Sequence, residues 1–252
     1  MESNPLYYFE EFNEEIFAVY ERESLLTLSK VMVGEKRLAS TMYDTVMKKV
    51  NIHPLPYSMF KLEDEMNFIT KDVKYITGVL FYLRPFIIDT EESGGRYNQN
   101  LADRRFLMYA NFGLQSIYNF WDRIGDLLHL YFETGLDINS VYFGRVLNNI
   151  KPIHKTSPSY IELNDIYNNE LSAFLGERHT AVHHYQLEAQ YYWAALENRT
   201  NDIERAKFND AKHALPEKFR HHLNLCFKGY ELAERLISTL PDKPETPATP
   251  AQ

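Results

Sequence analysis

Cysteine is almost absent from this chain of 252 residues, which contains Cys226 and no other. A single cysteine excludes a disulfide within the chain and zinc sites built from several thiolates. It also fits a reducing compartment, in which free thiols persist. We therefore interpret Cys226 as a small apolar residue of a hydrophobic core.

Glycine is scarce as well, with 10 residues, and few turn signals interrupt the chain. Low glycine content together with long periodic stretches favours helices over strands. No segment alternates apolar and polar residues over the length of a half-buried strand. Because hydrophobic residues make up 44% of the chain, a helical protein of this length can bury a large core.

Positive charge is in deficit, since 27 lysines and arginines face 35 aspartates and glutamates. A formal charge of −8 excludes broad, sequence-blind binding to a phosphate backbone, although a small basic pocket remains compatible with it. The acidic start MESNPLYYFEEFNEE lacks the segments of a signal peptide, and no uncharged run is long enough to span a bilayer. We expect a cytoplasmic protein without a membrane partner.

Apolar residues recur at steps of three and four along two stretches, which places each set on one face of a long helix. The first set lies between residues 101 and 133 and consists of Leu107, Ala110, Leu114, Ile117, Trp121, Ile124, Leu128 and Tyr131. The second set consists of Phe219, Leu223, Cys226, Tyr230, Ala233 and Ile237. Two such seams are typical of helices packed in a bundle core.

Shorter periodic stretches and proline positions predict the remaining helices. They are expected at 6–22, 28–49, 58–83 and 139–150, with a break near Ser24. Another helix opens with Ser157-Pro158, an N-cap followed by proline at the first helical position, and its apolar spacing continues to Phe174, just before the stretch 176–186. Residues 187–214 are expected to form an insertion with its own helix. Its aromatic triplet, 191–193, either packs against the bundle or offers a stacking platform for an unpaired base.

The pattern as a whole predicts an all-α fold, an antiparallel multi-helix bundle with extra N-terminal helices. Residues 1–99 are expected to supply N-terminal helices packed on the bundle, and residues 100–240 the bundle itself. Residues 241–252 are expected to form a flexible tail. Its prolines recur at every third position, which favours extended polyproline II, and it offers few apolar groups to bury.

Residues 176–186 read GERHTAVHHYQ and gather one arginine and three of the nine histidines. On a regular helix each residue turns by about 100°, so Arg178 and His183 project about 140° apart. His179 and His183, four residues apart, share a face instead. A site that uses both Arg178 and His183 therefore needs a helix end, a bend, or a cleft between two helices or two chains.

Spacing alone leaves three interpretations of this cluster open. His179 and His183 can bind a divalent metal as an i,i+4 pair, which requires a third ligand that no second spacing identifies. Alternatively, Arg178 binds a phosphate with its planar charged fork while His183 transfers protons near neutral pH. The third interpretation is a solvated polar helix surface without a specific role.

The run from Arg178 to His183, RHTAVH, resembles the R-x4-6-H signature of the HEPN superfamily (higher eukaryotes and prokaryotes nucleotide-binding domains). His179 matches the polar residue that often follows the arginine in this superfamily. The motif of these proteins lies late in an all-α bundle, before one more long core helix, as it does here before residues 216–239. The stretch FWDRIGDLLHLYF, residues 120–132, is also similar to an upstream helix of some members.

The resemblance implies a HEPN-like ribonuclease that needs no metal or other cofactor. The ribose 2′-OH attacks the adjacent phosphate and leaves a cyclic phosphate and a 5′-OH. The resemblance makes His183 the proton-transfer group, Arg178 the phosphate ligand that stabilises charge, and His179 a residue that orients RNA or assists. It also implies RNA as a partner, a homodimer whose two motifs meet in one cleft, a toxin or antiviral defence role and, in some members, an antitoxin protein.

Residues beside the motif extend this expectation. His184 gives a second match, R-x5-H, but we favour His183 because four intervening residues is the commoner spacing. His184 and Tyr185 are expected to contact the substrate. Asp122 either orients His183 or forms, with Asp126, an exposed acidic pair beside an arginine.

Two other functions are compatible with the same residues. The pair His179-x3-His183 resembles one half of the three-histidine site of DinB-like metal enzymes, and His53 is the candidate for the third histidine. A non-catalytic helical module that binds RNA or another protein is the second alternative. The acidic charge of the chain and its many aromatic residues are compatible with such a role.

Overall fold

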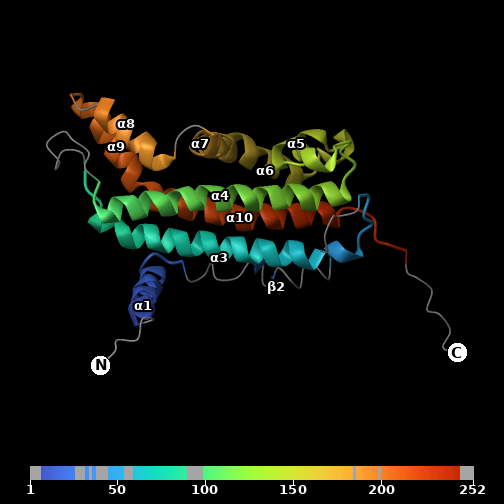
Figure 1. Cartoon of the computed structure of the whole chain (residues 1–252). Coiled ribbons are helices and arrows are strands. Elements are labelled where there is room, and N and C mark those ends of the chain that lie inside the picture. The colour runs from blue at the N-terminus through green and yellow to red at the C-terminus, as the bar shows by residue number, and fades with distance from the viewer. Residues whose placement is uncertain are drawn as a thin grey trace.

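The computed structural model describes residues 7–25, 32–33, 36–37, 45–53, 59–89, 99–183, 186–197 and 200–244. For residues 7–9, 32–33, 36–37, 59–60 and 179–183 it describes the backbone alone. Helices dominate the described residues, as Figure 1 shows. The prediction of an all-α bundle with extra N-terminal helices is therefore confirmed.

Three long helices lie side by side and form the centre of the bundle (Figure 1). They are α3 (Met59–Leu83), α4 (Leu101–Tyr131) and α10 (Leu215–Ser238), and each packs on the other two. All members of the two predicted apolar seams are buried on α4 and α10, including Cys226. The predicted seams are therefore confirmed as the main contact surfaces of the core.

Close approach of α4 and α10 depends on a glycine. A β carbon at Gly229 of α10 would lie 2.3 Å from the Trp121 ring of α4, which is too close for two carbon atoms. A second glycine acts at the start of α5 (Phe143–Asn149), where a β carbon at Gly125 would lie 2.9 Å from the backbone nitrogen of Phe143. The beginning of α5 therefore rests directly on α4, next to Asp122.

A second layer covers one side of α4 and α10. It consists of α5, α6 (Pro158–Ile166), the π-helical turn η6 (Tyr167–Leu171) and α7 (Ser172–His183), which follow one another along the bundle (Figure 1). Proline stands at the start of α6 as expected, although the preceding Ser157 makes no side-chain cap hydrogen bond. Residues 176–183 thus belong to a helix that lies over α4.

The segment 187–214 forms two helices where the sequence predicted one. They are α8 (Leu187–Glu197) and α9 (Asp202–His213), which lie together at one end of the bundle (Figure 1). Asn201 begins α9 by accepting a hydrogen bond from the backbone nitrogen of Glu204, an ordinary N-cap. This cap sits in a polar stretch with few apolar residues, which is why periodicity alone did not indicate a second helix.

The N-terminal region contains the clearest difference from the prediction. The helix α1 (Tyr7–Arg22) is as expected and ends where Ser24 adopts a left-handed φ of 58°. The helix predicted over 28–49 is wrong for the residues described there. They form the strands β1 (Met32–Val33) and β2 (Lys36–Arg37), which pair in antiparallel fashion, and the 3-10 turn η2 (Val46–Lys48).

Strand pairing and a glycine in the sequence explain this difference. Met32 pairs with Arg37 and Val33 with Lys36. The residue after Val33 in the sequence is glycine, which is unfavourable in the interior of a helix and outweighs the helical spacing of the flanking apolar residues.

Part of the predicted flexible tail makes backbone contacts. Asp242 forms a bridge with Lys49, and the backbone nitrogen of Lys243 donates to the carbonyl oxygen of Lys48 at 2.7 Å. The Nζ of Lys49 also lies 2.8 Å from Oδ1 of Asp242. Residues 245–252 of the predicted tail lie outside the described residues. Among the described helices, none has the length and apolar character needed to cross a membrane.

Candidate active site

The motif residues lie at the C-terminal end of α7. Arg178, His179 and His183 all belong to this helix, and His183 is its last residue. Because α7 stays helical between them, Arg178 and His183 are five helical positions apart, which corresponds to a rotation of about 140°. The side chains of His179 and His183 are not described, and His184 and Tyr185 lie outside the described residues.

Arg178 is held against α4 by two neutral side chains. Its Nε and Nη2 donate to Oε1 of Gln115 at 3.2 and 3.0 Å. The guanidinium carbon lies 3.9 Å from the ring centre of Tyr118, in cation–π contact. Gln115 is itself oriented, because its Nε2 donates to Oδ1 of Asn119 at 2.7 Å. Three residues on one face of α4 therefore fix the position of Arg178.

The charge of Arg178 is not neutralised by this arrangement. Among the described residues, no carboxylate forms an ion pair with its guanidinium, and the Nη1 atom has no hydrogen-bond partner. The side chain is only partly buried. A positioned guanidinium with remaining N–H donors and a net positive charge is suited to binding a phosphate oxygen.

Asp122 extends the same face of α4 by one helical turn. The pKa of its carboxyl group is raised to about 6, mainly by burial and less strongly by the nearby charge of Asp126. Hydrogen bonds from the Tyr118 hydroxyl and the Phe143 backbone nitrogen, and the charge of Arg123, oppose this shift. Asp122 therefore exchanges a proton close to neutral pH while bonded to the tyrosine on which Arg178 stacks.

The two aspartates that we considered as an acidic pair have different direct partners in the structure. Asp126 forms an ion pair with Arg123 at 2.9 Å, whereas Asp122 is partly buried between Tyr118 and the start of α5. Asp122 and Arg178 therefore both lie beside Tyr118. The predicted role of Asp122 in orienting His183 concerns a side chain outside the described ones and stays a prediction.

Gln115 and Tyr118 are functional candidates that the sequence did not single out. Neither carries a charge, and neither lies in a recognisable motif. A signal was nevertheless present, because Gln115, Tyr118, Asn119 and Asp122 occupy positions i, i+3, i+4 and i+7 of α4. This spacing forms a polar stripe beside the apolar seam of the same helix.

Replacing Asp122 by asparagine is expected to change how stability depends on pH. The folded pKa of about 6 lies above the unfolded value near 3.8, so the folded state holds this proton more tightly. The resulting stabilisation is fully present below pH 3.8 and is lost as the pH rises through 6. Wild type should therefore lose about 1–2 kcal/mol more stability than Asp122→Asn between these limits, after an allowance for solvent screening.

Urea unfolding at pH 4 and pH 7 measures this difference. The exposed Asp72→Asn on α3 is the matched control, since it removes a carboxylate from the surface. A free-energy difference between wild type and Asp122→Asn that is equal at both pH values would contradict the proposed titration.

Comparison with protein-family models identifies a family that the chain matches. A family model described as HEPN_Cthe2314-like HEPN matches residues 90–239, more than half of the chain. The matched range begins before α4 and ends after α10, and it includes α7 with the motif. No curated protein and no solved structure matches the chain.

Proposed function

Because the chain belongs to the HEPN_Cthe2314-like family of HEPN domains, we propose that it is a metal-independent endoribonuclease with Arg178 and His183 as catalytic residues. The observation that carries this proposal is the arrangement of Arg178. Its guanidinium is held in place by an amide and an aromatic ring, and the described residues leave its charge unpaired. An arginine with a purely structural role is more often paired with a carboxylate when it is partly buried.

The proposed reaction is an internal transesterification of RNA. The 2′-oxygen attacks the adjacent phosphorus while the bond from phosphorus to the 5′-oxygen breaks. His183 accepts the proton of the 2′-OH, and the leaving 5′-oxygen takes up a proton, so that no water is consumed. The products are a 2′,3′-cyclic phosphate and a 5′-OH, and Arg178 stabilises the negative charge on the phosphate oxygens.

A homodimer is part of the proposal because of helical geometry. Residues five positions apart on α7 face directions about 140° apart, so one chain does not present them to one point. A cleft between two copies of α7 allows the arginine of one chain and the histidine of the other to reach the same phosphate. A cytoplasmic ribonuclease of this kind suits a toxin or antiviral effector that an antitoxin protein restrains.

Cleavage of single-stranded RNA in the presence of EDTA tests this proposal. We expect cleavage to persist in the chelator and the fragments to carry cyclic phosphate and 5′-OH ends. The active fraction should elute as a dimer in size-exclusion chromatography. Activity that returns only with added zinc, nickel or manganese would favour a metal enzyme of the DinB-like type, and a monomer without activity would favour a binding module.

A further inference from the structure

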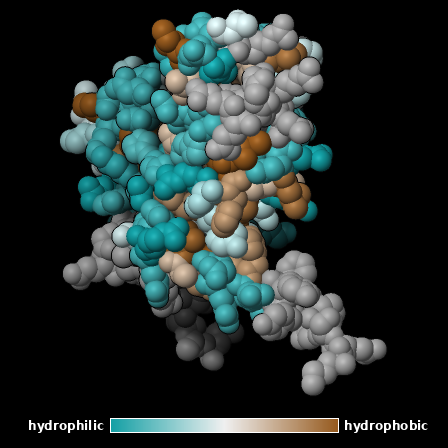
Figure 2. All heavy atoms as spheres, turned by 90° about the vertical axis from the view of Figure 1, so that its left-hand side faces the viewer, coloured by the Kyte–Doolittle hydropathy of each residue, from teal (hydrophilic) through white to brown (hydrophobic). Residues whose placement is uncertain are grey.

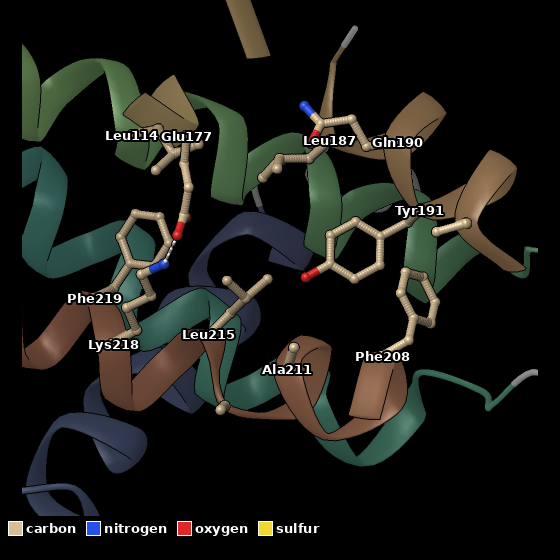
Figure 3. A pocket seen from close by; sticks show the side chains of 12 residues that line it. Leu114, Glu177, Leu187, Gln190, Tyr191, Phe208, Ala211, Leu215, Lys218 and Phe219 are labelled. Carbon is tan, nitrogen blue, oxygen red and sulfur yellow. Dashed lines mark hydrogen bonds and ion pairs between the residues drawn. The ribbon is translucent and has the colours of Figure 1, made fainter. Parts of the chain in front are cut away.

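A pocket lies beside the motif helix, at the end of the bundle that carries α8 and α9. It has a volume of about 460 Å³, within the range of small-molecule sites. Its walls come from α4, α8, α9 and α10, with one residue of α7 at the rim (Figure 3). Most lining side chains are apolar, namely Leu114, Leu187, Tyr191, Ala194, Phe208, Ala211, Ala214, Leu215 and Phe219. Figure 2 shows apolar side chains grouped among hydrophilic ones on this end of the molecule.

Polar groups occur at specific points of this apolar pocket. The Tyr191 hydroxyl points into the space between Leu187 and Leu215 (Figure 3), and no described residue forms a hydrogen bond with it. Burial raises the pKa of Tyr191, so the hydroxyl remains a hydrogen-bond donor at neutral pH. At the α7 rim, Nζ of Lys218 lies 2.6 and 2.5 Å from the two carboxylate oxygens of Glu177. The pocket therefore offers both donors and acceptors to a ligand.

Aromatic rings line the far side of the same pocket. The rings of Tyr191 and Phe208 lie 4.6 Å apart between centres, at an angle of 50°. Flat heteroaromatic ligands pack on such rings, while a few polar groups read their edges. An aliphatic chain would leave the Tyr191 hydroxyl and the Glu177–Lys218 pair without use. The chemistry of the pocket therefore favours a planar ring with polar edges.

The pocket and the Arg178 site are built from adjacent residues of the same two helices. Glu177 directly precedes Arg178 on α7, and Leu114 directly precedes Gln115 on α4. Consecutive residues of a helix project about 100° apart, so the pocket and Arg178 lie on adjoining sides of the same turns of α7 and α4. A nucleotide whose phosphate contacts Arg178 reaches the pocket when its base extends around the edge of α7.

We propose that this pocket binds one unpaired base of the RNA substrate, next to the phosphate that is cleaved. The inference rests on the proposed ribonuclease function and adds to it a base-specific subsite. The Tyr191 hydroxyl and the Glu177–Lys218 pair read the polar edge of the base, and the apolar walls enclose its faces. Unpaired bases held in this way are the usual basis of sequence preference toward single-stranded RNA.

Direct binding of the four nucleoside 3′-monophosphates tests the pocket without requiring catalysis. Isothermal titration calorimetry on the full chain should show binding of at least one of them. Tyr191→Phe removes the hydroxyl and should weaken that binding by about five- to tenfold. Ala211→Leu fills the pocket from an exposed position and should weaken it by tenfold or more. Tyr192→Phe, on the exposed side of α8, is the control and should bind like wild type.

Sequencing of cleaved RNA ends provides the second readout. Both pocket variants should lose the base preference at one position beside the cut, while the control keeps it. RNA cleavage with unchanged nucleotide binding and unchanged preference in both variants would overturn the base pocket and leave the ribonuclease proposal intact. Pocket-dependent nucleotide binding by a wild-type chain that cleaves no RNA would support the pocket and overturn the ribonuclease proposal.

Discussion

Arg178→Ala and His183→Ala are each expected to slow RNA cleavage by about 10²- to 10³-fold. Alanine at position 178 removes the cation that we propose binds the phosphate, and no described cation stands beside Gln115 and Tyr118 to replace its charge. Alanine at position 183 removes the group proposed to transfer the proton. Single-turnover cleavage of a labelled RNA measures both effects, because it isolates the chemical step from product release.

Matched variants separate catalysis from folding. Arg178→Lys keeps a positive charge but loses the planar fork that stacks on Tyr118 and bonds to Gln115, so we expect an intermediate rate. His184→Ala changes the neighbouring histidine, which we expect to contact the substrate without transferring the proton, so its single-turnover rate at saturating enzyme should stay well above that of His183→Ala. If His184→Ala is as slow as we expect His183→Ala to be, the motif histidine is His184 and the motif is R-x5-H. Wild-type rates for Arg178→Ala and His183→Ala would overturn the mechanism.

Periodicity predicted the parts of this fold that depend on burial. The two apolar seams identified α4 and α10 because every third or fourth residue of a long helix must face the core. The motif helix was predicted for the same reason, since the apolar spacing after Ser157 continues to residue 174. The π-helical turn η6 within that stretch was not predicted, because one added residue per turn leaves no signature in composition.

The sequence predicted the charged residue of the site but not the neutral residues that hold it. Arg178 was predicted because it is an arginine in a motif, whereas its partners are a glutamine and a tyrosine on another helix. Gln115 and Arg178 are 63 residues apart in the sequence, so no local sequence pattern predicts their contact. Contacts between distant neutral residues depend on how helices pack, and therefore need the structure.

A buried ion pair between α9 and α4 is a second contact that the sequence did not predict, and it has a larger effect on stability. Lys212 of α9 lies 3.1 Å from Oδ1 of Asp103 at the start of α4, and both side chains are fully buried. Asp103 also accepts from the backbone nitrogen of Asn100 in a capping box, and Lys212 donates to the carbonyl oxygen of Ile88. The sequence places Lys212 in the polar stretch before α10, where lysine is ordinarily exposed.

Lys212→Met is expected to lower the free energy of unfolding by about 3–5 kcal/mol. Methionine matches the length of the lysine stem but leaves the Asp103 carboxylate buried without its cation, and desolvation of that charge is costly. Urea unfolding at pH 7 measures the loss. The exposed Lys207→Met on the same helix, which breaks a surface pair with Glu204, is the control and should cost about 1 kcal/mol or less.

The double variant Lys212→Met/Asp103→Asn tests the cause of that loss. Asparagine removes the buried negative charge and keeps an oxygen that can accept from the Asn100 backbone nitrogen. If an uncompensated charge is responsible, the double variant should be more stable than Lys212→Met alone by about 1–3 kcal/mol. If the double variant is less stable than Lys212→Met, the uncompensated charge is not the cause. The loss of unfolding free energy would then come from the packing of the lysine stem and its hydrogen bond to Ile88.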